Sequence, residues 1–144
     1  MRVGIRIRRL GSDNRGVAAL EFALIVPGLV LMIVGIAQLG SLFMANAGLS
    51  EAVAAGARYA TIWPRPSDTQ IRNCVIGAAY GLPTALGTPG VSHGTSNGAS
   101  YIDITATYTM QTDFIFFTGP SVTLSETRRA FQQPTSATVT APNC

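Results

Sequence analysis

One stretch decides the fold of this chain: residues 17–44 read VAALEFALIVPGLVLMIVGIAQLGSLFM. The stretch carries a single charged residue, Glu21, and from Phe22 to Met44 its only polar side chains are Gln38 and Ser41. About 20 apolar residues in a helix suffice to cross the roughly 30 Å hydrocarbon layer of a bilayer. The stretch therefore predicts one membrane-spanning helix.

Positive charge is concentrated ahead of this stretch. Residues 1–16 contain five of the ten arginines and one of the seven acidic residues, whereas the rest of the chain has a slight excess of acids. Arginine close to a membrane span is retained in the cytoplasm, so topology explains the basic segment better than nucleic-acid binding does. We therefore expect a cytoplasmic N-terminus, an exterior C-terminal part and no nucleic-acid partner.

Glu21 is unusual because a carboxylate at the start of an apolar helix costs about 2.5 to 3.5 kcal/mol when it lies unpaired at bilayer depth. Two interpretations are open. Glu21 marks the membrane surface, at the positive end of the helix dipole, or it pairs with a cation. Cleavage after Gly16 would supply that cation, because it creates an amino terminus on Val17 and makes Glu21 the fifth residue of the mature helix.

A known family has this pattern. The run from Gly16 to Leu24, GVAALEFAL, followed by Pro27, resembles the type IV pilin and pseudopilin leader. More narrowly, it is similar to the TadE-like family of minor pseudopilins of the tight adherence (Flp-type) pilus system. The run from Glu51 to Ala60, EAVAAGARYA, is similar to that family's continuation of the helix. The resemblance covers about residues 14–62.

The resemblance implies processing and assembly, not catalysis. A prepilin peptidase in the bacterial inner membrane would cut between Gly16 and Val17, and Glu21 would pair with the new amino group of Val17 during assembly. The implied partners are this peptidase, other pilins or pseudopilins, pilus-assembly membrane proteins and the membrane itself. The protein would be single-pass, with a cytoplasmic N-terminus and an exported C-terminal domain in the periplasm or outside the cell.

Two other interpretations of the N-terminus compete with this one. Ala45-Asn46-Ala47 has the small-x-small form of a secretory cleavage site, but the apolar run is longer than the 7 to 15 residues typical of a signal peptide. A plain signal anchor without processing also fits the span, although it leaves Glu21 without a partner. We expect a leader over residues 1–16, a transmembrane and amphipathic helix over 17–62, and a small exported domain over 63–144.

The remainder of the chain predicts an α+β domain with a pilin-like outline. Ser67 to Gln70 has the Ser-x-x-Gln form of a capping box, which predicts a second, short helix. Residues 83–99 have loop composition. Residues 101–110 alternate between apolar and polar side chains, and residues 122–131 are similar, so they predict an antiparallel hairpin or small sheet packed on the first helix. Trp63 is expected to pack.

The cysteines are the remaining candidate site. Cys74 and Cys144 either form a disulfide or remain two thiols, and we favour the disulfide in a small exported domain. His93 is the only histidine and is expected in an exposed loop, so no metal site is predicted. The sequence offers no catalytic constellation and no cofactor motif.

These observations lead to one functional hypothesis and one alternative. The chain is predicted to be a minor pseudopilin-type structural or assembly component of a tight adherence pilus or a related secretion apparatus. The alternative is a membrane-anchored exported binding module that never enters a filament. Processing after Gly16 discriminates between them.

Overall fold

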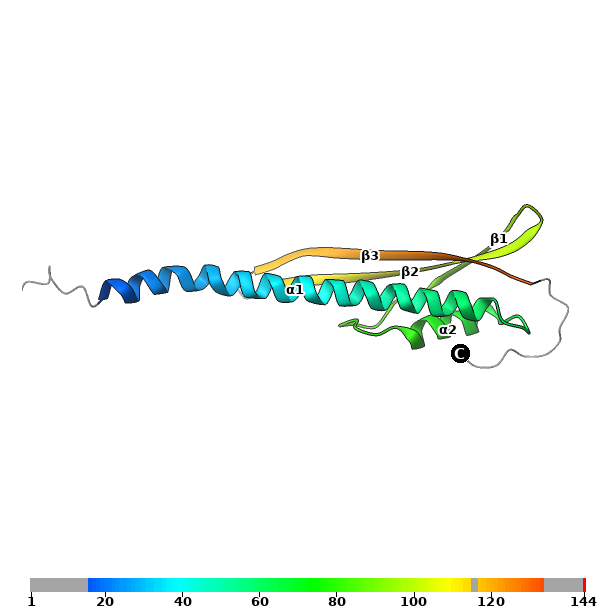
Figure 1. Ribbon diagram of the computed structural model, residues 1–144, viewed down its shortest axis with the longest axis horizontal. Helices are drawn as coiled ribbons and strands as arrows, with labels where there is room; N and C mark the ends of the chain where they lie inside the picture. Colours follow the sequence, from blue (N-terminus) through cyan, green and yellow to red (C-terminus); the bar gives the residue numbers. More distant parts are fainter. Residues whose placement is uncertain (1–15, 115–116, 134–143) are drawn as a thin grey trace, which may run out of the picture.

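The computed structural model describes residues 16–114, 117–133 and 144; the expected leader therefore lies almost entirely outside the described residues. Figure 1 shows a long helix, α1 (Val17–Ala60), with its C-terminal half flanked by a short helix and a sheet. The short helix is α2 (Asp68–Ala78), and the strands are β1 (Gly90–Ser96), β2 (Ala99–Phe114) and β3 (Phe117–Phe131). The predicted α+β fold is confirmed.

Helix α1 is continuous over 44 residues, which at 1.5 Å per residue is about 66 Å. Pro27 lies inside it without ending it. On the exposed surface near its C-terminus, Arg58 donates a hydrogen bond to Glu51 at 2.6 Å. The helix ends at Ala60, and the backbone N–H of Thr61 closes its last turn.

Helix α2 begins as its sequence predicts. The Ser67 hydroxyl accepts a hydrogen bond from the backbone N–H of Gln70, and the Gln70 side chain accepts one from the backbone N–H of Ser67. This reciprocal capping box satisfies two backbone donors that the first turn of a helix leaves without partners. Ile71, Cys74 and Val75 then form the buried face of the helix.

The three strands form one antiparallel sheet in the order β1-β2-β3. Strands β1 and β2 are joined by Asn97 and Gly98, both with positive φ, and Ser96 pairs with Ala99. This is the two-residue turn that Asn-Gly sequences favour. The expectation of a loop over residues 83–99 is therefore wrong for its second half. The Asn-Gly turn reverses the chain, so the Gly- and Thr-rich residues before it pair with β2 as a strand. The last strand also begins earlier than expected, at Phe117.

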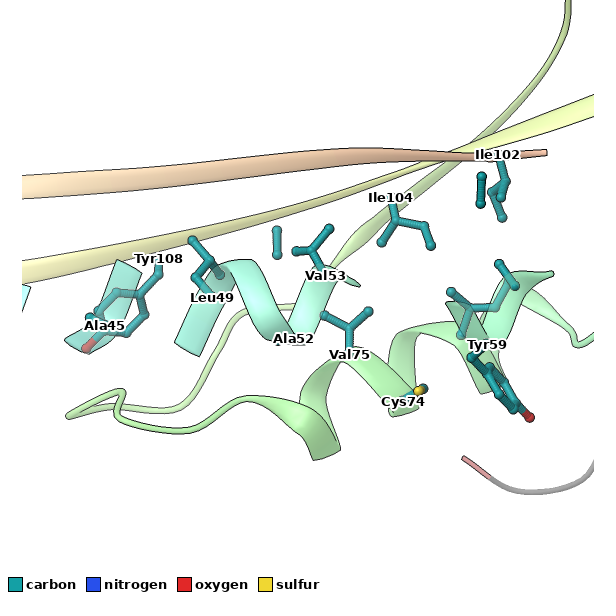
Figure 2. Packing of buried hydrophobic residues seen from close by; sticks show 14 of the residues in the cluster. Ala45, Leu49, Ala52, Val53, Tyr59, Cys74, Val75, Ile102, Ile104 and Tyr108 are labelled. Atoms are coloured by element: carbon teal, nitrogen blue, oxygen red, sulfur yellow. The ribbon is translucent and has the colours of Figure 1, made fainter. Parts of the chain in front are cut away.

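The core lies between the C-terminal half of α1, the sheet and α2. Figure 2 shows Leu49 and Val53 of α1 near Ile104 and Tyr108 of β2 on one side, and Val75 of α2 on the other. Alternate residues of β2 are buried, as the sequence predicts, because successive side chains of a strand point to opposite faces. The largest fully buried side chains are Leu49, Val53, Ile71, Val75, Ile102 and Ile104.

Trp63 does not belong to this core. It follows α1 in the connection to α2 and is 53% exposed, so the expectation that it packs is wrong. The core positions near the end of α1 are taken by Tyr59 and Ala60 instead. Trp63 therefore stands as an exposed aromatic residue beyond the end of α1.

Candidate functional site at the membrane helix

The first half of α1 exposes apolar side chains in all directions. Its most apolar 18-residue window has a mean hydropathy of 2.5, and no residue of that window is buried. By length and composition, α1 could cross a membrane. Its large exposed apolar residues before Gln38 are Val17, Leu20, Phe22, Leu24, Ile25, Leu29, Met32, Ile33 and Ile36.

Gln38 is the point at which the sheet meets this apolar helix. Its side-chain Nε2 donates a hydrogen bond to the backbone carbonyl oxygen of Asp113 at 2.9 Å. Gln38 and Ser41 line a cavity of about 380 Å³ together with Tyr108 and Asp113. The two polar residues of the apolar run thus face the end of the hairpin formed by β2 and β3. We use the term head for α1 from Gln38 onward together with α2 and the sheet.

A membrane span within α1 would end near Gln38 and not at Met44. Asp113 lies beside Gln38, and an unpaired carboxylate at bilayer depth costs about 2.5 to 3.5 kcal/mol. The segment from Val17 to Ala37 has 21 residues, so as a helix it is about 31 Å long, one hydrocarbon thickness. Residues 38–44 therefore belong to the head, although their composition continues the apolar run.

The predicted processing residues lie at the start of the helix. Gly16 is the N-cap residue of α1 and makes no side-chain capping bond, and Val17 is the first helical residue. The Glu21 side chain is exposed and makes no hydrogen bond or ion pair with another residue of the described part of the chain. Val17 and Glu21 are four residues apart, so they lie on the same face of α1. The structure thus places all three residues of the proposed processing and assembly site at the N-terminal end of α1.

The two cysteines lie in the head. A disulfide joins Cys74 of α2 to Cys144, with their Cα atoms 5.4 Å apart and 70 residues apart in sequence. A recess of about 460 Å³ lies beside it. The recess is lined by Tyr59, Gln70, Asn73, Cys74, Gly77, Ala78 and Cys144, so it has no charged lining residue among those described.

His93 differs from the sequence-based expectation. It lies in strand β1, not in a loop, and its Nε2 is 2.9 Å from Oδ1 of Asp68 in the first turn of α2. Its Nδ1 is 3.0 Å from a guanidinium nitrogen of Arg65. His93 therefore connects the sheet to the start of α2. Within residues 16–114, 117–133 and 144 no group of three metal-ligating side chains comes together.

A two-point ion pair joins the last two strands of the sheet. Arg129 of β3 donates two hydrogen bonds to the carboxylate of Asp103 on β2, at 2.7 and 2.8 Å. These bonds hold the pKa of Asp103 below its ordinary value and raise that of Arg129. The same guanidinium lies 3.8 Å from the ring centre of Tyr101. The sequence shows the alternation of these strands but not which residues stand opposite each other, so this cluster could not be predicted.

Comparison with known proteins finds a match for the N-terminal part of the chain. Residues 16–58 match the model of the TadE-like protein family. The resemblance seen in the GVAALEFAL run and in the EAVAAGARYA run is therefore confirmed over these residues. No curated protein and no solved structure matches the chain.

Proposed function

We propose that this chain is a minor pseudopilin-type component of a tight adherence (Flp-type) pilus or a related secretion apparatus. Helix α1 anchors it in the bacterial inner membrane, the head is exported, and a prepilin peptidase removes residues 1–16. The observation that carries this proposal is the family match, which begins at Gly16 and runs along the apolar helix to Arg58. The role is structural and does not involve catalysis.

The exposed surface of α1 favours a helix that packs against other proteins over one that only anchors the head. Large apolar side chains remain exposed beyond Gln38, at Leu39, Phe43 and Met44, which are 55%, 72% and 60% exposed. A helix that only anchors a head needs no apolar surface outside the hydrocarbon layer. Contiguous exposed apolar surface is typical of a site where another protein packs. We infer that helices of neighbouring subunits or of assembly proteins cover these residues.

In this proposal, Glu21 determines how the helices of neighbouring subunits align. After cleavage, the ammonium group of Val17 in one subunit meets the carboxylate of Glu21 in a neighbour. A buried ion pair adds little stability over apolar residues, but loss of one member leaves the other charge unpaired at a cost of about 3 to 5 kcal/mol. The pair therefore selects one longitudinal register between helices.

Processing is the decisive test. We expect the intact mass of the mature chain from bacterial membranes to lack residues 1–16, and Gly16→Leu to accumulate as the full-length precursor. Gly35→Leu is the matched control, because a β-carbon at either position would meet no other residue of the described chain within 4 Å. Gly35→Leu should be cleaved normally.

Two outcomes would contradict the proposal. A mature mass that is unchanged by Gly16→Leu would exclude the peptidase, because that enzyme requires the residue before the cut to be small. A wild-type chain that retains residues 1–16 and co-purifies with no assembly protein would favour the alternative, a membrane-anchored binding module.

A further inference from the structure

The sheet of the head lies along α1 with its β2–β3 hairpin directed toward the N-terminal half of the helix (Figure 1). Two hydrogen bonds define this orientation. At the C-terminal end of α1, the Gln132 side chain donates a hydrogen bond to the carbonyl oxygen of Ala60 at 3.4 Å. In the middle of α1, Gln38 donates a hydrogen bond to the carbonyl oxygen of Asp113. The hairpin therefore ends beside the outer limit of the span that we assign to residues 17–37.

The end of this hairpin is aromatic. Phe114 and Phe117 are paired across the two strands, and their rings stack with centres 4.8 Å apart. Phe117 is 55% exposed. Residues at a hairpin end in water are usually Gly, Asn, Asp, Ser or Pro, which suit tight turns and hydrate readily. An aromatic pair in this place needs an apolar or amphipathic surface to cover it.

Side-chain hydrogen bonds also join the two strands near the hairpin end. Gln111 donates a hydrogen bond from Nε2 to the carbonyl oxygen of Gly119, and Thr112 donates one from its hydroxyl to that of Pro120, both at 2.6 Å. These bonds join β2 to β3 immediately before the aromatic pair. These bonds and the bond from Gln38 to Asp113 therefore fix the position of the aromatic pair along α1.

We propose that Phe114 and Phe117 form a second membrane contact, in which the aromatic pair enters the headgroup region of the outer leaflet beside α1. Phe side chains bind a bilayer surface by entering the boundary between the headgroups and the acyl chains, where their apolar rings leave water. Asp113, the residue before Phe114, then remains at the polar side of the boundary. Contact at two points, the helix and the hairpin, holds the head at one rotation and one tilt relative to the membrane.

The proposal requires that α1 spans the membrane, as in the proposed function, but it does not depend on cleavage or on a role in pili. The test uses tryptophan emission, because Trp63 is the only tryptophan in the chain. The full chain is reconstituted into phosphatidylcholine vesicles whose acyl chains are unmodified, brominated near the headgroup or brominated near the chain end. Bromine quenches a tryptophan only at short range.

Three tryptophan positions are compared. The wild-type chain reports on Trp63, which lies past Ala60 and hence more than about 30 Å along the helix from Gln38. The Trp63→Phe, Phe117→Trp variant reports on the hairpin, where an aromatic ring is retained. The Trp63→Phe, Leu29→Trp variant reports on the middle of the apolar helix.

We expect brominated lipid to quench the tryptophan at position 117 several-fold more than Trp63. Quenching at position 29 but not at 117 would overturn the hairpin contact and leave the membrane span intact. A blue-shifted but unquenched emission at 117 would also overturn it, because a protein surface would then cover the pair. Absence of quenching at position 29 by lipid brominated near the chain end would refute the span, and the hairpin proposal with it.

Discussion

The carbonyl oxygen of Tyr80 occupies the space that a side chain at Gly48 would need. A β-carbon built on Gly48 would collide with this oxygen, so the segment that follows α2 contacts the backbone of α1 directly. Gly48 is buried in the middle of the helical face that carries Ala45, Leu49 and Ala52. Close approach of two backbones requires glycine at the contact, because any side chain would push them apart.

Gly48→Ala should therefore destabilise the head by about 1 to 3 kcal/mol, the usual cost of overpacking. The matched control is Gly77→Ala in α2, where a β-carbon meets no other described residue within 4 Å. Alanine there should stabilise the helix by up to about 1 kcal/mol. Thermal unfolding of the full chain in detergent, followed by near-UV circular dichroism, measures both. Because the two expected effects have opposite signs, a small effect of the same sign in both variants would contradict the Tyr80 contact.

The contact between Asp103 and Arg129 predicts a dependence of stability on acid pH. Because the folded state lowers the pKa of Asp103, its stabilising contribution is complete above the unfolded value of about 3.9 and is lost as the pH falls through the lower folded value. Asp103→Asn should remove this part of the acid dependence. Arg129→Gln should do the same, since the guanidinium is the cause, and the double variant should show no further loss. Melting temperatures between neutral pH and pH 2 test this, and an undiminished acid dependence in all three variants would contradict it.

The disulfide between Cys74 and Cys144 predicts a difference between non-reducing and reducing gels of the exported protein. Closing a loop with a sequence separation of 70 residues should stabilise the fold by about 4 kcal/mol on chain-entropy grounds. The Cys74→Ser, Cys144→Ser double variant should lose that stability and migrate identically under both conditions. Two thiols that react with an alkylating reagent in native exported protein would rule out the bond.

Glu21→Ala should affect assembly and leave folding intact. We expect the variant to be inserted, cleaved after Gly16 and stable, but to co-purify poorly with pilus-assembly partners and to give few or no pili. Glu51→Ala is the matched control, because Glu51 is an exposed α1 carboxylate that is paired with Arg58 on the surface of the head. Normal piliation in the Glu21→Ala strain would refute the charge-pairing mechanism and would leave the membrane topology untouched.

Local patterns in the sequence were sufficient for several elements of this molecule. The apolar run predicted the long helix, the Ser67 to Gln70 capping box predicted the start of α2, and the alternation of residues 101–110 predicted the buried face of β2. Each of these features depends on interactions within a few residues along the chain, so the amino-acid types alone determine it. The TadE-like resemblance likewise rests on a short contiguous motif that begins at Gly16.

Only the tertiary structure shows the contacts between residues that are distant in sequence. Composition alone extends the apolar run to Met44, whereas the hydrogen bond from Gln38 to Asp113 shows that the sheet already contacts α1 at Gln38, about two helical turns earlier. In the same way, strand pairing brings Arg129 to Asp103, and the packing of β1 beside α2 brings His93 to Asp68. Strand register and helix packing are set by the fit of whole surfaces, and no local window of sequence contains both sides of that fit.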